Sequence, residues 1–159
     1  MSKDLSIRFC AFLLILLCGC MSLEKVPPEQ RSVQRIHEIN LRQNQIFDKS
    51  LEWMARTFVD SKEVIELKDR EGWKIIGKGI TDFLAGGIAK INCRFTMVID
   101  IKDGKYRTTY ENLIGLFDYG RQPQALEHKD YIDQVKIKIN EIDDSLYRFL
   151  GSLKATEKW

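Results

Sequence analysis

Cysteine and histidine are scarce in this chain. Its 159 residues include four cysteines and two histidines, and none of them stands in a Cys-x-x-Cys, His-x-x-x-His or calcium-loop pattern. The two histidines, His37 and His128, are far apart in the sequence, which disfavours a structural zinc site. The sequence therefore predicts neither a metal site nor a cofactor.

A large excess of charge of either sign is also absent. The chain carries 25 lysines and arginines against 23 aspartates and glutamates, a net charge of +2. Binding to nucleic acid depends on neutralising many phosphates, which requires a strong basic excess. We therefore expect no nucleic-acid partner, and the length suits one domain with a single core.

Long apolar runs are missing, and the one run at the N-terminus is short. Lys3 and Arg8 precede the apolar residues 9–17, a run about half as long as the ~20 residues that a membrane-spanning helix needs. A basic start, a short apolar core and a small residue before a cysteine are typical of a secretory signal peptide. Residues 1–19 are therefore predicted to be removed.

The segment Leu17-Cys18-Gly19-Cys20 resembles the lipobox of bacterial lipoproteins, in which the final cysteine becomes the lipidated first residue. The resemblance implies that Cys20 carries the lipid. Cys18 fits that role less well, because bulky Leu17 would then precede the cut. The alternative is a buried apolar segment. We expect a lipid anchor in a bacterial envelope, and Met21, which is not the aspartate associated with inner-membrane retention, favours the periplasmic or surface face of the outer membrane.

Residues 20–32 begin with the predicted anchor. The segment is polar and contains Pro27-Pro28, which disfavours a helix and keeps the chain extended. A fully extended chain of this length spans about 40 Å. The pattern predicts a tether, then one globular domain over residues 33–153 and a C-terminal tail over residues 154–159.

The first half of the domain alternates between strand and helix patterns. Residues 33–39 are typical of a short strand, and a helix is expected after Asn40. Within this helix, Trp53 is expected at the margin of the apolar face that faces the core, or partly exposed to solvent. Residues 63–68 and 73–80 are typical of a hairpin, and residues 81–89 of a flexible loop. The apolar face of the helix is predicted to be Phe47, Leu51, Met54 and Phe58.

The clearest pattern is the strict alternation of apolar and polar residues from Ile91 to Lys102. Asp103-Gly104 follows, the pair that a two-residue type I′ turn favours. With Lys102 opposite Lys105, apolar residues meet on one face and opposite charges meet on the other, and a slip of one residue would lose both. Cys93 lies on the apolar side and is expected to be buried rather than to act as a nucleophile.

A second helix is predicted from about Lys129 to Leu150, with Gly151 as its end. We expect its apolar face to cover the sheet, although the same spacing is a heptad seam that could join two copies of the chain. The apolar positions recur at steps of three and four: Ile132, Val135, Ile139, Ile142, Leu146, Phe149 and Leu153.

Four stretches carry a family resemblance, over residues 51–58, 68–72, 75–79 and 99–107. They resemble a family of bacterial envelope domains of unknown function whose fold is like that of the TATA-binding protein (TBP), and the similarity covers residues 33–114. The order of the patterns is β-α-β-β-β-β-α. Together these imply an α+β domain, a curved antiparallel five-stranded sheet with two helices packed on one face. The fold implies no mechanism and no DNA binding.

Groups that could converge on a catalytic centre are few, and we expect no enzyme. A Cys93–His37 pair would need both side chains on one side of the sheet. The adjacent Asp143 and Asp144 point about 100° apart around a helix and are expected to solubilise it. A small hydrolase, the less favoured alternative, would need a deep pocket around His37 or His128.

The solvent side of the sheet is the remaining candidate for binding. The simpler interpretation is a solvated face with cross-strand ion pairs. The functional one is a shallow polar surface for an envelope protein or glycan. We therefore expect a non-catalytic binding or assembly module, with a homodimer through the last helix or a sheet edge as the alternative. The candidate binding residues are Lys74, Lys78, Arg94, Thr96, Arg107, Thr109 and Glu111.

Overall fold

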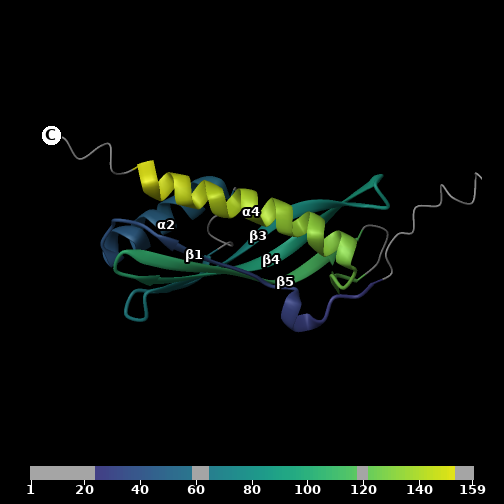
Figure 1. Cartoon of the computed structure of the whole chain (residues 1–159), viewed down its shortest axis with the longest axis horizontal. Coiled ribbons are helices and arrows are strands. Elements are labelled where there is room, and N and C mark those ends of the chain that lie inside the picture. Colours follow the sequence, from purple (N-terminus) through teal and green to yellow (C-terminus); the bar gives the residue numbers. More distant parts are fainter. Residues whose placement is uncertain (1–23, 59–64, 118–121, 153–159) are drawn as a thin grey trace, which may run out of the picture.

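The computed structural model describes residues 24–58, 65–117 and 122–152, and in them one antiparallel sheet carries two α-helices on the same face (Figure 1). None of the helices in this part of the chain has the length and hydropathy needed to cross a bilayer. The elements in chain order are η1 (Pro28–Gln30), β1 (Val33–Glu38), α2 (Gln43–Thr57), β2 (Ile65–Asp69), β3 (Lys74–Ala85), β4 (Ala89–Lys102), β5 (Lys105–Leu116), β6 (Gln124–Ala125) and α4 (Lys129–Gly151).

The sheet has the strand order β1-β5-β4-β3-β2, with every neighbouring pair antiparallel. The five predicted strands are all present, and the predicted α+β fold is confirmed. A sixth strand, β6, pairs with β5 and lies in the segment just before α4. Its backbone is held in place because Leu126 N–H donates to the carbonyl of Leu113 at 2.8 Å.

The β4–β5 hairpin has the register that the sequence predicts. Lys102 pairs with Lys105, and Asp100 pairs with Arg107. Gly104 has a φ of 74°, a conformation that glycine adopts without steric cost. The turn and the alternation of polar and apolar residues therefore agree on one pairing.

A β-bulge interrupts this hairpin further along β5. Between Arg94 and Thr96 of β4 the partner strand carries one extra residue, and Asn112 has a φ of 54°. An extra residue reverses the alternation of side chains. Before the bulge the even-numbered residues of β5, such as Tyr110, are buried under the helices. After the bulge an odd-numbered residue, Leu113, is buried instead.

Residues 81–85, which were expected to belong to a flexible loop, instead extend strand β3. Only residues 86–88 connect β3 to β4, and Gly86 and Gly87 have φ values of 60° and 74°. The strand continues because its side chains find partners on α4: the ring of Phe83 lies 4.9 Å from that of Tyr131. The glycine pair is thus the turn itself, and the prediction of a longer loop is wrong.

Helix α2 buries Phe47 and Met54 of its predicted face, but the buried stripe is shifted around the helix. Trp53, expected at the margin or partly exposed, is 3% exposed, and Leu51 is only partly buried. The reason is that α4 packs beside α2, where the indole Nε1–H of Trp53 donates to Ser145 Oγ at 3.3 Å. The contact with a second helix rotates the buried face toward Trp53.

Helix α4 lies along the sheet and covers it with its apolar face (Figure 1). The predicted seam is used inside the chain, because its residues pack into the common core; Leu153, its last member, lies outside the described residues. A second copy of the chain would have to displace the sheet to use this face. Buried on α4 are Ile132, Val135, Ile139, Asp143, Leu146 and Leu150.

From Glu24 onward the predicted tether is part of the domain. The N–H of Lys129 donates to the carbonyl of Glu24 at 3.0 Å, and the N–H of Val26 donates to that of Glu127 at 2.8 Å. The Arg31 side chain closes the segment by donating to the carbonyl of Val26 at 2.7 Å. Cys20 itself lies outside the described residues, so the lipid anchor stays a prediction.

Candidate functional site

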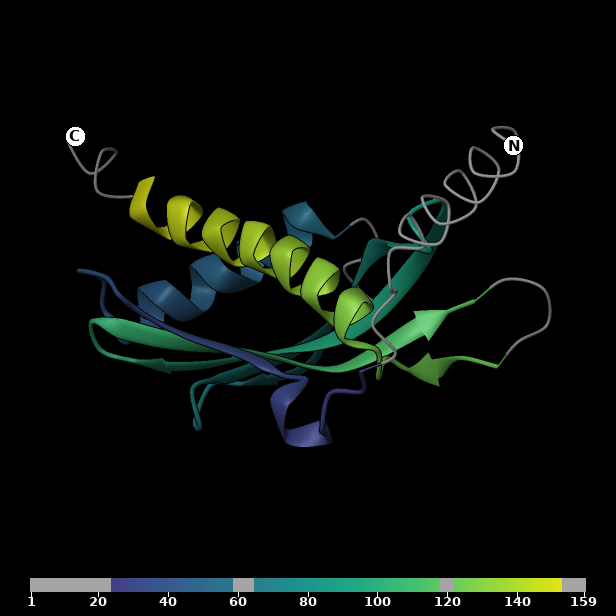
Figure 2. The ribbon, with the colours of Figure 1, turned by 45° about the vertical axis from the view of Figure 1, so that its right-hand side comes forward.

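Both α-helices lie on one face of the sheet (Figure 2). The predicted binding residues alternate along the strands with the residues buried beneath the helices, so they lie on the other face. The strand register brings them together across three strands: Lys78 of β3 is opposite Thr96 of β4, which is opposite Glu111 of β5. We call this surface the open face, defined by Lys74, Lys78, Arg94, Thr96, Asp100, Arg107, Thr109 and Glu111 together with the outward residues Ile36 and Ile80.

Ion pairs hold one half of the open face. Asp100 receives Arg107 Nη2 at 2.7 Å and Lys74 Nζ at 3.3 Å. Partial burial alone would raise the pKa of Asp100, but the hydrogen bonds from Arg107 and Lys74 outweigh it and hold the pKa below its usual value. Lys78 pairs with Glu66 of β2. This half matches the simpler interpretation, a solvated face with cross-strand pairs.

The other half has charges that are not satisfied in this way. Among the residues that the structure describes, neither Arg94 nor Glu111 forms a side-chain ion pair, although both lie on the open face. Thr96 and Thr109 each accept one weak hydrogen bond, from Asn112 Nδ2 and Gln34 Nε2, both at 3.3 Å. These groups are available to an external partner.

Exposed apolar side chains on the open face were missed by the sequence analysis. Ile36 of β1 is 66% exposed and Ile80 of β3 is 60% exposed. In each strand, the residues directly before and after the isoleucine point toward the helices, so the isoleucine itself points to the open face. The sequence signal for this exposure was an isoleucine at a strand position that alternation assigns to the polar side. The two isoleucines place apolar margins on either side of a polar centre.

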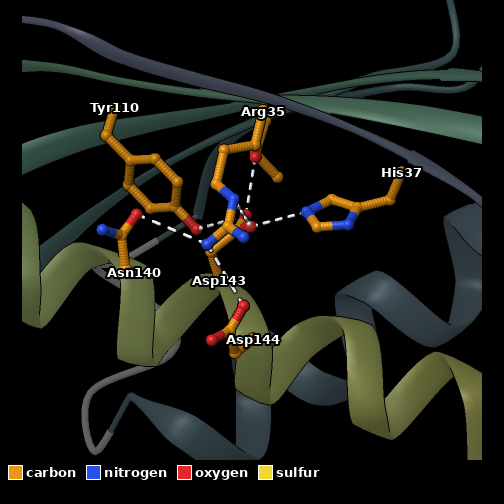
Figure 3. A network of polar contacts seen from close by, with 7 residues as sticks. Arg35, His37, Tyr110, Asn140, Asp143 and Asp144 are labelled. Atoms are coloured by element: carbon orange, nitrogen blue, oxygen red, sulfur yellow. Dashed lines mark hydrogen bonds and ion pairs between the residues drawn. The ribbon is translucent and has the colours of Figure 1, made fainter.

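A second polar cluster lies under α4, around a fully buried carboxylate (Figure 3). Asp143 Oδ1 accepts hydrogen bonds from Thr108 Oγ1 at 2.6 Å and from the Tyr110 hydroxyl at 3.1 Å. Its Oδ2 lies 2.6 Å from His37 Nε2 and 3.4 Å from Arg35 Nε. Side chains of β1, β5 and α4 therefore converge on one group.

The expectation that Asp143 solubilises the helix is wrong, whereas Asp144 is exposed as expected and accepts from Arg35 Nη1 at 3.1 Å. Asp143 follows Ile139 by four residues and precedes Leu146 by three. Those spacings place it on the buried face of the helix. The sequence signal was an aspartate in phase with the apolar stripe.

Aromatic rings enclose this cluster. His37 stacks between Tyr106 and Tyr147, with ring centroids 5.0 Å apart in both pairs. The pKa values of Tyr106 and Tyr110 are raised above the usual tyrosine range, mainly by burial and further by the charge of Asp143. Both tyrosines therefore stay neutral, and the cluster ties β1 and β5 to α4.

The residues considered for catalysis do not meet. Cys93 is buried, its Sγ lies 3.6 Å from the carbonyl of Arg94, and burial raises the pKa of its thiol to about 12. His37 faces Asp143 instead. His128 precedes α4 and lines a surface hollow of about 450 Å³ with Glu127 and Tyr131. No group of three metal-ligating side chains occurs within the described ranges.

The comparison with protein families gives a match over the sheet-forming part of the chain. Residues 34–114, just over half of the chain, match DUF4468, a domain of unknown function with a TBP-like fold. No curated protein matches the chain.

Several solved structures are similar to this chain, including the following two. A TBP-like protein from Parabacteroides distasonis ATCC 8503 is 11% identical, with a TM-score of 0.57 over 76% of this chain and 96% of that chain. A DUF4468 family protein from Bacteroides ovatus ATCC 8483 is 14% identical, with a TM-score of 0.53 over 84% of this chain and 91% of that chain. At such identities the likeness establishes the fold alone.

Proposed function

We propose that this chain, which belongs to the DUF4468 family of domains of unknown function with a TBP-like fold, is a lipid-anchored envelope protein that binds a partner with the open face of its sheet. The anchor is Cys20, supported by the lipobox-like segment that ends the signal peptide. The role is non-catalytic, binding or assembly of another envelope component. The partner is an envelope protein or glycan.

The composition of the open face carries this proposal. A sheet face that meets only water is expected to be polar throughout. Here Ile36 and Ile80 are both more than half exposed and flank a polar centre. Arg94 and Glu111, without ion pairs among the described residues, lie within that centre. Apolar contacts beside unpaired charges suit a specific interface, because the charges select the partner and the apolar groups contribute affinity.

The His37–Asp143 contact supports a structural role for the buried cluster rather than catalysis. A catalytic histidine must reach both a nucleophile and a substrate. Asp143 is fully buried and accepts from Thr108 and Tyr110 as well, and the His37 ring is stacked between two tyrosines. The thiol of Cys93 is neutral at physiological pH because its pKa is about 12. These contacts favour a clamp between sheet and helix.

Photo-crosslinking in whole cells tests the proposal. A photoreactive amino acid replaces Ile36 on the open face, and the matched control carries it at Ile137, an isoleucine on α4 that is 60% exposed. We expect an adduct from position 36 and none from position 137. Arg94→Ala combined with Arg107→Ala should remove the adduct and lower the melting temperature only slightly, because both side chains are at the surface and the exposed Arg107–Asp100 ion pair contributes less than about 1 kcal/mol.

The nature of the adduct identifies the partner class. Crosslinked peptides from a second protein, found by mass spectrometry, indicate an envelope protein, and an adduct whose added mass glycan-degrading enzymes remove indicates a glycan. A product of twice the mass of the chain indicates a homodimer through this face. Equal labelling from positions 36 and 137, or none from position 36, contradicts the proposal.

A further inference from the structure

We infer that the tip of the β3–β4 hairpin contacts the lipid bilayer that holds the anchor and thereby orients the domain on the membrane. The tip is defined as residues 84–88, from Leu84 to Ile88. This inference rests on the lipidation of Cys20 proposed above. The tip contacts the lipid bilayer itself and not another protein.

The connection between the anchor and the folded domain is short. Cys20 precedes Glu24 by four residues, so a fully extended chain between them reaches at most about 14 Å. Glu24 is fixed to the domain, because its carbonyl accepts the N–H of Lys129 at 3.0 Å. Lys25 adds an ion pair with Glu127 at 2.7 Å and an antiparallel bridge with His128. The start of α4 must therefore lie close to the bilayer surface.

The hairpin tip belongs to the same end of the molecule. Gln134, in the second turn of α4, holds both backbone groups of Leu84: its Oε1 accepts the N–H of Leu84 at 2.9 Å and its Nε2 donates to the carbonyl at 3.2 Å. The rings of Phe83 and Tyr131 are 4.9 Å apart. Figures 1 and 2 both show the hairpin projecting past the start of α4, whereas the C-terminal end of α4 lies at the opposite end of the molecule.

The tip is apolar where it projects. Ile88 is 90% exposed and Leu84 is 44% exposed. Gly86 and Gly87 between them carry no side chain, so Ile88 is the most exposed large apolar side chain of the tip. The charges behind the tip cancel, because Lys90 and Asp82 form an ion pair at 3.0 Å. An isoleucine at the end of a hairpin therefore faces the surface to which the anchor holds the domain.

The contact orients the domain and does not replace the anchor. Two apolar side chains bury too little area to hold a protein on a membrane alone. Once a lipid keeps the domain at the surface, the effective concentration of the tip at the bilayer is high, and a small gain is enough to set the orientation.

Quenching by nitroxide lipids tests this contact. The lipidated full chain is purified from cells, its mass is checked, and it is placed in vesicles of phosphatidylethanolamine and phosphatidylglycerol that contain nitroxide-labelled acyl chains. A fluorescent amino acid replaces Ile88, and the control carries it at Ile137, which is also an exposed isoleucine but lies on α4. We expect severalfold stronger quenching at position 88 than at position 137. With the fluorophore at Leu84, Ile88→Asp should reduce the quenching.

The outcomes separate this inference from the proposed function. A lipidated protein whose position 88 is quenched no more than position 137 overturns the inference and leaves the anchor intact. A protein without lipid overturns both. A photo-crosslinker at position 88 that captures another protein or a second copy of the chain, rather than lipid, also overturns the inference.

Discussion

At the scale of single residues, the fully buried carboxylate of Asp143 accepts hydrogen bonds from Thr108 and Tyr110 and lies within 3.4 Å of His37 Nε2 and Arg35 Nε. A buried charge is tolerated only when it is paired and its lone pairs are satisfied. The donors come from β1 and β5, so only one seating of α4 satisfies the carboxylate. The buried cluster thus fixes how the helix lies on the sheet.

Removing this carboxylate should be strongly destabilising. We expect Asp143→Ala to lower the free energy of unfolding by about 3–5 kcal/mol, because it leaves several buried donors without an acceptor. The matched control, Asp144→Ala, removes an exposed partner of Arg35 and should cost less than about 1 kcal/mol. Denaturant unfolding followed by circular dichroism measures both, and equal losses would contradict the assigned role of Asp143.

The thiol of Cys93 should be inert in the folded protein. Burial raises its pKa to about 12, so the reactive thiolate is nearly absent at pH 8. In a variant that lacks residues 1–19 and carries Cys20→Ala, Cys93 is the only cysteine. We expect a disulfide reagent to modify it only as fast as the protein unfolds, and quickly in denaturant. With a pKa of about 12, the folded thiol is only about one part in a thousand thiolate even at pH 9. Direct reaction of the folded protein therefore stays negligible and unfolding sets the rate, so the native rate should stay nearly constant between pH 7 and 9, where that of a free thiol rises. Rapid native labelling would contradict this.

At the scale of elements, local pattern predicts structure where one signal decides it. The β4–β5 hairpin follows from Asp103-Gly104 and the alternation beside it, and its register is confirmed. The length of β3 and the burial of Trp53 were predicted wrongly. Both depend on α4, because Tyr131 of that helix packs against Phe83 and Ser145 of that helix accepts a hydrogen bond from Trp53. Contacts between segments 48 to 92 residues apart leave no periodic trace in either segment.

The turn of this hairpin should be sensitive to a single methyl group. Gly104 has a φ of 74°, where any other residue pays roughly 1–2 kcal/mol. We expect Gly104→Ala to lower the melting temperature by about 4–8 °C. Gly151→Ala is the matched control, because Gly151 lies in helix α4 with nothing near its added Cβ, and it should leave the melting temperature unchanged or slightly higher. Equal melting temperatures for the two variants would show that the turn does not need glycine.

At the scale of the whole molecule, two helices cover one face of the sheet and leave the other to solvent. Alternation along the strands predicted which side Lys78, Arg94 and Glu111 occupy. The apolar margins at Ile36 and Ile80 were missed, because hydrophobicity alone assigns such residues to the core and only their place in the polar phase of the strands indicates otherwise. The docking of Glu24 beside Lys129 was also beyond reach, since it joins backbone groups of two segments without a shared motif.

The anchor at Cys20 is the premise of the proposed function and of the membrane contact, and the intact mass of the protein tests it most directly. The full-length chain, Cys20→Ala and the matched control Cys18→Ala are expressed in a bacterium that processes lipoproteins, then weighed and extracted with and without detergent. We predict that the unaltered chain and Cys18→Ala lose residues 1–19, gain the mass of a lipid and need detergent for extraction, and that Cys20→Ala gains no lipid. An unmodified protein extracted without detergent, or a lipid that survives Cys20→Ala and is lost in Cys18→Ala, would contradict the account.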